Sequence, residues 1–571
     1  MTAFGTGHAA TWFINAQNCI RRFASPINRP AACHRPATTL SQYRRVPAGS
    51  VGRAHFIPVS VPHGISSDSQ MTAFLALIVP LGLLGLSTVR NIRLGINLGD
   101  EGYLVYGTTR LMEGEVPIRD FRAYDPARYY WCALWFWLLG PGFIAARVSM
   151  AVLSFGSVVM VVLLGVHITQ SAVVGALLGC VSLGWMFPRH KQVEIFFSIL
   201  CSCALYALLS GATNAYVLGV SAALACAFGL NIFIYYAAAT FLAVIAGGVA
   251  DPVMFGVQYS VASAFTLLIF LAIASRAPGF LGCYLDRKVL RILRRGSTNL
   301  ALPKPWLGTS PPQFMRFSRG RRLAFQAIFT LIPVTSVLTI AVFADRSWLA
   351  RSDGGALAMA SACTALVYFH HFYSRADLGH LSQTFHPVLI MIAACSHALL
   401  GAVGAMVILI LCLVGTIALL RGEGEFPFRN LRRRADAETF EDLGNGIRVA
   451  RPVARKLIRM RDIIQTHTAS GSTLFAAPAC SAYLVLFDRK SAVYDTFPVY
   501  PSTPAGRSEM LAQFTAAAPQ AVILSDAPID QRDDLRFANN YAELTSYIRK
   551  NYEVAMESGP ETLYLRSAPK I

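Results

Sequence analysis

The sequence predicts a polytopic α-helical membrane protein, with about 11 transmembrane helices and a small C-terminal α/β soluble domain. Of its 571 residues, 54% are hydrophobic and only 14% are charged, which is too apolar for a soluble protein of this length. Eleven apolar segments between residues 71 and 420 each approach the roughly 20 residues that span a bilayer. Mixed polar sequence with short apolar runs follows, as expected for a soluble α/β domain.

Three domains follow from this pattern. Residues 1–70 carry seven arginines and one acid without periodicity, which predicts a disordered basic tail. Met71 stands at the edge of the first apolar segment and is a candidate for the true start. Residues 71–420 form the membrane domain, and residues 421–571 form the C-terminal domain. In that last domain, apolar runs predict strands at 473–477, 482–487, 521–524 and 562–566, and helical stretches lie near 506–518 and 540–551.

The order of the spans sets the topology. We expect spans at 71–90, 143–167, 171–187, 193–210, 215–231, 232–250, 253–275, 324–344, 355–370, 386–400 and 402–420. A cytoplasmic N-terminus then places the long polar loops and the C-terminal domain on the outer face. The positive-inside rule points the other way, because residues 276–322 and 421–461 each hold eleven Lys or Arg. That rule weakens for long loops, and a face that binds phosphate needs cations.

Charge and cysteine usage narrow the function classes. The net charge of +19 is concentrated in the N-terminal tail and in the two basic stretches, which favours anionic lipid or a phosphate-bearing substrate over nucleic acid. The twelve cysteines show no CxxC pair, and most lie inside apolar segments. They are expected to be core residues and to form neither disulfides nor metal sites.

Residues 99–131 form the most highly charged loop of the membrane domain. Six acids stand beside four arginines there, so the loop must lie in water at a membrane face. A solvated connection between two helices is the simpler interpretation. The aromatic run at 127–140 is too short to cross and predicts an interfacial helix.

Two further polar segments separate apolar helices. PRHKQVE, residues 188–194, contributes Arg189, His190 and Lys191 at a membrane boundary, where cations either serve a site or anchor helix ends to headgroups. In FHHFYSRADLGHLSQTFHP, residues 369–387, the adjacent histidines suggest a metal site. If a helix begins there, Asp377 and His380 share a face, and a hydrogen-bonded Arg-Asp-His cluster fits better.

Another outer loop, residues 296–310, combines Asn299, Lys304 and Trp306. Trp306 is a candidate for stacking on a sugar or for the aromatic belt. Asn231, between two apolar runs, needs a hydrogen-bond partner or a cavity.

These motifs carry a family resemblance. Asp-Glu-Gly at 100–102, Gly-Glu-Val-Pro-x-Arg-Asp-Phe at 114–121 and Arg-Ala-Asp-x-x-His-Leu at 375–381 resemble polyprenyl-phosphate-sugar-dependent glycosyltransferases of the GT-C superfamily. That superfamily includes the protein O-mannosyltransferases and the aminoarabinose transferases. The likeness covers roughly residues 71–420. It departs at Tyr-Asp-Pro-Ala, residues 124–127, where aminoarabinose transferases carry Glu-Lys-Pro, and Lys191 or Arg128 is the candidate substitute for the missing lysine.

The resemblance implies a GT-C type membrane enzyme of the inner (plasma) membrane. It would move a sugar from a polyprenyl-phosphate donor to a glycan, lipid or protein acceptor on the outer face, with inversion. Asp100 is then the base or a ligand for a divalent metal ion, Glu101 supports it, and Gly102 leaves space for a substrate. Of the two carboxylates, Asp100 is expected to make the indispensable contact, because adjacent helical residues point about 100° apart. The residues expected to bind substrate are Arg189, His190, Lys191, Lys304, Arg375, Asp377 and His380.

The alternative from another class is a flippase or transporter of lipid-linked sugars. Such a protein would carry charged breaks in the middle of its spans and similar polar loops on both faces. The polar residues of this chain gather in the loops that we place on one face, which favours a transferase.

Overall fold

The structure is a computed structural model that describes residues 67–295, 299–309, 314, 317–344, 353–429, 440–442 and 446–567. Residues 67–571 form one compact unit. The predicted basic tail lies outside the described residues up to residue 66.

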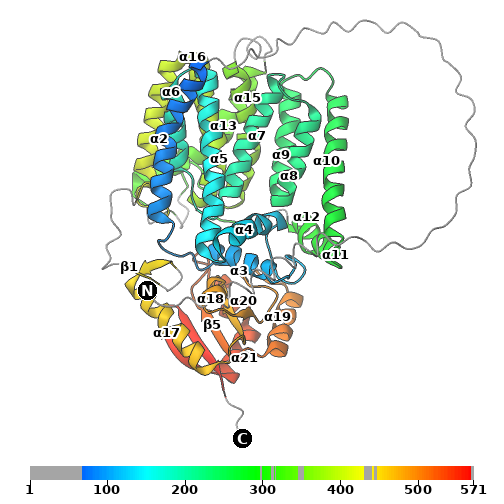
Figure 1. The fold of residues 1–571 in the computed structure, drawn as a ribbon, viewed down its shortest axis with the longest axis vertical. Coiled ribbons are helices and arrows are strands. Elements are labelled where there is room, and N and C mark those ends of the chain that lie inside the picture. Colours follow the sequence, from blue (N-terminus) through cyan, green and yellow to red (C-terminus); the bar gives the residue numbers. More distant parts are fainter. Residues whose placement is uncertain are drawn as a thin grey trace, which may run out of the picture. The chain divides into compact units, whose positions relative to one another are not determined.

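A bundle of apolar helices makes up the membrane part (Figure 1). Within the described residues, six helices are long and apolar enough to cross a membrane. The last of these is interrupted at Gly401, which has a non-helical φ of 69° and ψ of −174°. Gly401 lies between the last two predicted spans. The prediction of a polytopic helical membrane protein is confirmed. The bundle comprises α2 (Ser67–Asn91), α5 (Phe143–Thr169), α6 (Ala172–Gly184), α7 (Gln192–Leu209), α8 (Ala215–Phe228), α9 (Leu230–Ala246), α10 (Pro252–Ala274), α13 (Arg319–Phe343), α15 (Asp353–Ser374) and α16 (Leu378–Leu420).

Large apolar side chains cover the outside of this bundle. On α10, Val253 is 75% exposed and Phe265 is 65% exposed, and Val403 on α16 is 69% exposed. A soluble protein would bury such continuous apolar faces, whereas lipid accommodates them.

The charged loop and the aromatic run after it fold into two helices that are too short to span the membrane. In α3 (Asp100–Met112) both acids of the first turn stand near the free backbone N–H groups at the helix start. Pro126 occupies the first turn of α4 (Pro126–Leu139), where its missing N–H costs nothing. After α10, residues 280–295 form three short helices, α11 (Phe280–Tyr284), η1 (Leu285–Leu290) and α12 (Arg291–Arg295).

The C-terminal region is an α/β domain built on a mixed sheet of five strands in the order β4-β3-β5-β7-β6. β3 pairs in parallel with β4 and β5, while β7 pairs antiparallel with β5 and β6. The predicted strand at 482–487 is wrong, because that run forms the helix α18 (Ala482–Leu486). The other elements are β1 (Phe440–Asp442), β2 (Arg448–Ala450), α17 (Arg451–His467), β3 (Thr473–Ala477), β4 (Lys490–Ser491), α19 (Pro504–Ala517), β5 (Ala521–Ser525), η3 (Asp533–Leu535), α20 (Phe537–Asn540), α21 (Ala542–Asn551), β6 (Tyr552–Ser558) and β7 (Glu561–Arg566).

α3 joins the C-terminal domain to the membrane part. One hydrophobic core includes Val105 from α3 and Phe136 from α4 together with Tyr483 from α18. At their contact, a Cβ on Gly102 would lie 2.3 Å from the backbone N of Ala482. The expectation that Gly102 leaves space for a substrate is therefore wrong: α18 fills that space.

We expect Gly102→Ala to weaken this docking. The added methyl group meets backbone, which cannot turn away as a flexible side chain can, and overpacking of this kind costs about 1–3 kcal/mol. Hydrogen exchange in α18 should accelerate, and the protein in nanodiscs should unfold at a lower temperature. Gly85→Ala on α2 is the matched control, because a Cβ there meets nothing within 4 Å. Equal exchange of α18 in both variants would contradict the close packing described here.

Candidate active site

Asp100 stands at the centre of a polar cluster at the start of α3. Its Oδ1 lies 3.3 Å from Lys191 Nζ and accepts a hydrogen bond from the Tyr124 hydroxyl at 2.9 Å. Burial alone would raise the pKa of this carboxyl, but the charges of Lys191 and His190 and the Tyr124 hydrogen bond hold the pKa well below its usual value. The side chain remains 38% exposed, so an ionised carboxylate faces open space.

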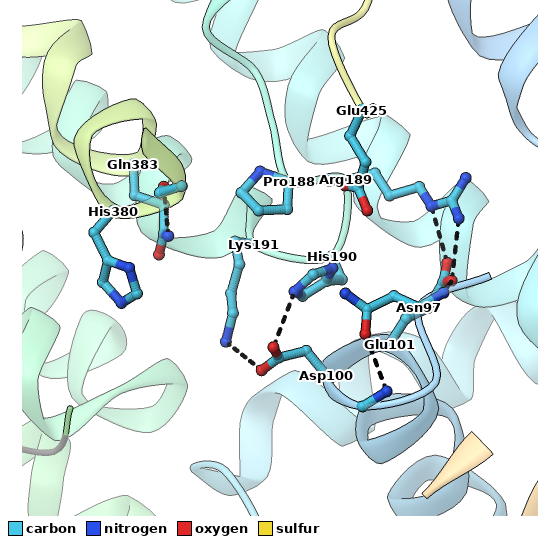
Figure 2. Close-up of polar contacts among 12 residues, drawn as sticks. Asn97, Asp100, Glu101, Pro188, Arg189, His190, Lys191, His380, Gln383 and Glu425 are labelled. Atoms are coloured by element: carbon cyan, nitrogen blue, oxygen red, sulfur yellow. Dashed lines mark hydrogen bonds and ion pairs between the residues drawn. The ribbon is translucent and has the colours of Figure 1, made fainter. Parts of the chain in front are cut away.

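Glu101 points elsewhere and is 2% exposed (Figure 2). Its Oε1 lies 2.6 Å from Arg147 Nε and 3.1 Å from Arg189 Nε, and its Oε2 accepts from Arg147 Nη2 at 2.8 Å. Burial opposes ionisation, yet the two guanidinium groups lower the pKa of Glu101 to about 2. The two neighbouring carboxylates thus diverge, and Glu101 ties α3 to α5 and to the loop before α7.

The loop before α7 supplies the cations. Arg189 also donates to the carbonyl of Leu94 at 2.7 Å, and its backbone N–H donates to Glu425 at 3.0 Å. His190 Nε2 lies 3.9 Å from Asp100 Oδ2, and burial lowers the pKa of this ring. Lys191 also donates to the Tyr124 hydroxyl at 2.9 Å. Figure 2 shows His190 and Lys191 directed at Asp100, while Arg189 reaches Glu101.

Tyr124 lies between two cations. Lys191 Nζ lies 4.6 Å and the Arg128 guanidinium carbon 5.2 Å from the centroid of its ring. Arg128 is itself held by Glu194 at 2.7 Å. The departure at residues 124–127 therefore places an aromatic hydroxyl next to Asp100, and both Lys191 and Arg128 approach the ring that carries this hydroxyl.

The basic segment after α10 adds another cation to this region. Lys288 Nζ lies 3.7 Å from Asp125 Oδ2, and Tyr284 donates to the same carboxylate at 3.2 Å. Burial lowers the pKa of Lys288, Asp125 opposes that shift, and the positive charges of Arg128 and other arginines add to it. Positive charge therefore accumulates around Asp125, one residue from Tyr124.

Arg375 joins the membrane part to the C-terminal domain. Its Nη1 and Nη2 each lie 2.6 Å from a carboxylate oxygen of Asp530, and its Nε donates to Asp377 Oδ2 at 2.8 Å. Burial would lower the pKa of Arg375, but these partners raise it above its usual value. The guanidinium is therefore already paired with two carboxylates.

Asp377 in turn holds His380. Its Oδ1 accepts from the His380 backbone N–H at 2.8 Å, which caps α16, and lies 2.9 Å from His380 Nδ1. The His371 ring lies 5.0 Å from the His380 ring between centroids. The predicted Arg-Asp-His cluster is thus present in the geometry, and His370 contacts Tyr235 instead.

The polar segment before α7 (residues 188–194) contacts the polar segment at the start of α16. A Cβ on Gly379 would lie 3.6 Å from Pro188 Cγ, and Ser382 donates to the carbonyl of Phe187. The start of α16 therefore packs against the loop that carries Lys191. Both segments face the region of Asp100 (Figure 2).

Comparisons with known proteins agree at the level of fold. No protein-family model and no curated protein matches the chain. The structure of ArnT from Cupriavidus metallidurans in the apo state matches with a TM-score of 0.50 and 13% identity, covering 87% of this chain and 98% of that one. The same protein bound to undecaprenyl phosphate matches with a TM-score of 0.46 and 11% identity, covering 88% and 99%.

The chain has the fold of ArnT. The GT-C resemblance of the sequence is thereby confirmed for the fold. The shared architecture covers the C-terminal domain as well as the bundle, although the sequence resemblance was confined to residues 71–420.

Not every residue expected to bind substrate joins the cluster. Asp100, Glu101, Arg189, His190 and Lys191 come together, and Asp377 with His380 lies on the adjoining segment. Lys304 lies 4.6 Å from the centroid of the Tyr373 ring and, among the described residues, makes no hydrogen bond or ion pair with this cluster. Trp306 packs edge-on against Phe329, and Asn231 lines a small cavity with Glu194 and His371.

A divalent metal ion does not fit the residues around Asp100. The nearest neighbours of the Asp100 carboxylate are the cation Lys191 and the hydrogen-bond donor Tyr124. The described part of the chain holds no group of three or more His, Cys, Asp or Glu that could hold a metal ion.

Sequence reasoning missed three contributors. Arg147 lies inside an apolar span, and only the expense of burying a charge there indicates that it has an acidic partner. Lys288 was counted only as part of a basic stretch. Asp530 lies in a domain for which no site was predicted.

Proposed function

We propose that the chain is a membrane glycosyltransferase that moves a sugar from a polyprenyl-phosphate donor to an acceptor on the outer face of the inner membrane, with inversion. The observation that supports this most is the pairing of an exposed, ionised Asp100 with Lys191 and Tyr124 in a chain with the fold of ArnT. The negative charge of Asp100 and the positive charge of Lys191 lie next to each other there. Transfer from a lipid phosphate needs a cation for the leaving phosphate and an anion for the sugar.

The cations serve the leaving group. Departure of the sugar leaves negative charge on the lipid phosphate, which positive groups stabilise. Lys191 Nζ lies 4.6 Å and the Arg128 guanidinium carbon 5.2 Å from the centroid of the Tyr124 ring, and Lys288 Nζ lies 3.7 Å from Asp125. We assign the donor phosphate to this group of cations.

Asp100 serves the sugar. Glycosyl transfer passes through a transition state with positive charge at the anomeric carbon, which a fixed carboxylate stabilises. Because its pKa is low, Asp100 stays ionised for this purpose. Arg189 is paired with Glu101, and we assign these two residues to positioning the loop that carries Lys191.

These groups come from α3, from α4 and the residues just before it, from the loop before α7 and from η1. A transporter would need similar polar groups along its path to the other face. A site assembled from these neighbouring segments favours transfer of the sugar over movement of the lipid.

Lys191→Ala should weaken binding of the donor phosphate. Losing a partly buried charge contact costs about 2–5 kcal/mol, which is at least about a thirtyfold rise in Kd. Undecaprenyl phosphate is the probe, titrated into the full-length protein in nanodiscs. Lys490→Ala removes a surface lysine and is the control, because that side chain is 56% exposed. Equal affinity in both variants would remove Lys191 from the phosphate site. If the native protein does not bind undecaprenyl phosphate either, the proposed function is refuted.

A further inference from the structure

We propose that His380 is the proton acceptor of the transfer reaction, and that the acceptor group is therefore a hydroxyl. The inference rests on the proposed function and names its acceptor class. It follows from three features: the orientation of the ring, the groups that fix this orientation, and the packing of its segment against the loop that carries Lys191.

The ring orientation leaves one nitrogen available. An ionised carboxylate accepts hydrogen bonds only, so the 2.9 Å contact with Asp377 Oδ1 assigns the proton of the neutral ring to Nδ1. Nε2 then carries the lone pair. Among the described residues no hydrogen bond to Nε2 is found, and the side chain is 16% exposed. The free lone pair is what a general base requires.

The orientation is fixed by residues from both parts of the chain. Asp377 receives one hydrogen bond from the His380 backbone and another from Arg375, and Arg375 is held in turn by both oxygens of Asp530. Burial alone would raise the pKa of Asp377, but the opposing effect of His380 and Arg375 is larger. The pKa therefore falls below its usual value and this carboxylate stays ionised. Asp530 has a φ of 55°, a conformation that few non-glycine residues adopt. The C-terminal domain thus holds Asp377 through Arg375.

The ring lies near the proposed phosphate site. Gly379, the residue before His380, packs against Pro188, which is three residues before Lys191. In Figure 2 the His380 ring and the Lys191 side chain extend in the same direction from these two segments, with Asp100 beside Lys191. An acceptor between them would meet His380 from one side and the donor from the other.

The division of labour follows from charge. Asp100 is held ionised by Lys191, so taking up a proton would break a favourable pair. Imidazole is the side chain best suited to accept a proton near neutral pH. The acceptor O–H bond breaks and its proton goes to Nε2. The oxygen forms a bond to the anomeric carbon as the bond from that carbon to the phosphate oxygen breaks, and the electron pair stays on the lipid phosphate beside Lys191.

A general base acts only in its unprotonated form, so the activity should rise with pH. Several charged or titratable groups surround the ring and shape this limb of the profile. They are Asp377 and Arg375 in its own turn, His371 from α15, Asp530 from the C-terminal domain, and His190 and Lys191 from the loop before α7.

The test uses full-length protein in nanodiscs and a panel of radiolabelled undecaprenyl-phosphate monosaccharides. Envelope membranes from a strain lacking the protein supply the acceptor. His380→Ala should lower turnover at least about a hundredfold, remove the rising limb of the pH profile and leave the affinity for undecaprenyl phosphate unchanged. Added imidazole should restore part of the turnover. Asp377→Asn, which removes the carboxylate but keeps a capping side chain, should lower kcat more than it changes the donor KM.

His467→Ala, at an exposed position on α17, is the control and should behave as the native protein does. Full turnover of His380→Ala with an unchanged pH profile would overturn the inference and point to an ionised acceptor such as a phosphate, while the proposed function stands. Loss of turnover together with loss of undecaprenyl phosphate affinity, without rescue by imidazole, would overturn it in favour of a structural role. A native protein that neither binds undecaprenyl phosphate nor transfers any sugar of the panel would overturn both proposals.

Discussion

Glu101→Gln should lower the free energy of unfolding by about 3–5 kcal/mol, the cost of removing one partner from a buried ion pair. Glu101 is 2% exposed and is the carboxylate partner of Arg147, which is 4% exposed. A neutral amide of the same shape leaves that guanidinium charged in a region closed to water. The sequence alone indicated only that Glu101 supports Asp100, whereas the structure assigns its largest effect to stability.

Chemical unfolding in mild detergent would measure this loss, with Asp120→Asn as the matched control. Asp120 pairs with Arg119 at 2.7 Å, but both side chains are about 30% exposed, so its loss should cost about 1 kcal/mol or less. Equal losses in the two variants would show that burial of the Glu101 pair carries no special weight.

The pH dependence has a definite sign. The pKa of Glu101 falls from an ordinary 4.5 to about 2 on folding, so the folded state holds this proton more weakly than the unfolded chain does. The resulting stabilisation, about 3 kcal/mol, is complete above pH 4.5 and is lost as the pH falls from 4.5 through 2. Glu101→Gln should lack this part of the acid-induced loss.

Hydropathy located the bundle because the requirement for apolar length acts on each helix by itself. The break between the last two spans was found correctly, since Gly401 with its φ of 69° interrupts an otherwise continuous apolar run. The run at 482–487 was misassigned, because short apolar segments fit a buried strand and a buried helix equally well. In the fold, this run packs through Ala482 against Gly102 of α3, 380 positions earlier, a contact that the local sequence does not reveal.

In the candidate site, too, local sequence features were predictable and contacts between distant segments were not. Asp100 and Lys191 were found from local motifs, since both lie where a charged loop meets an apolar helix. Their pairing across the fold, and the pairing of Arg375 with Asp530, join residues that are distant in the sequence. Arg375 was expected to bind phosphate because arginine does so in general, and its existing carboxylate partners could not be inferred from its neighbours in the chain.

Asp100 should matter most for turnover. Its carboxylate is 38% exposed and its partner Lys191 is 16% exposed, so its removal leaves a partly buried lysine without an acidic partner, whereas removal of Glu101 leaves the 4% exposed Arg147 without one. In the described part of the chain, Asp100 is the only acidic side chain that forms an ion pair with Lys191 within 4 Å. Asp100→Asn keeps the shape of the side chain and a hydrogen-bond acceptor for Tyr124, but removes the charge that would face the anomeric carbon.

We therefore expect Asp100→Asn to lower turnover by at least about a hundredfold, the usual loss when one preorganised electrostatic group is removed. The affinity for undecaprenyl phosphate should stay the same or rise, because Lys191 loses its competing carboxylate. Glu113→Gln is the matched control: that carboxylate is 44% exposed and pairs with Arg110 at 2.7 Å, and its loss should leave turnover unchanged. Single-turnover transfer and lipid titration on the same preparation separate the two effects. Full activity of Asp100→Asn would show that no charge is needed at this position, and the roles assigned to Asp100 and Lys191 would fall together.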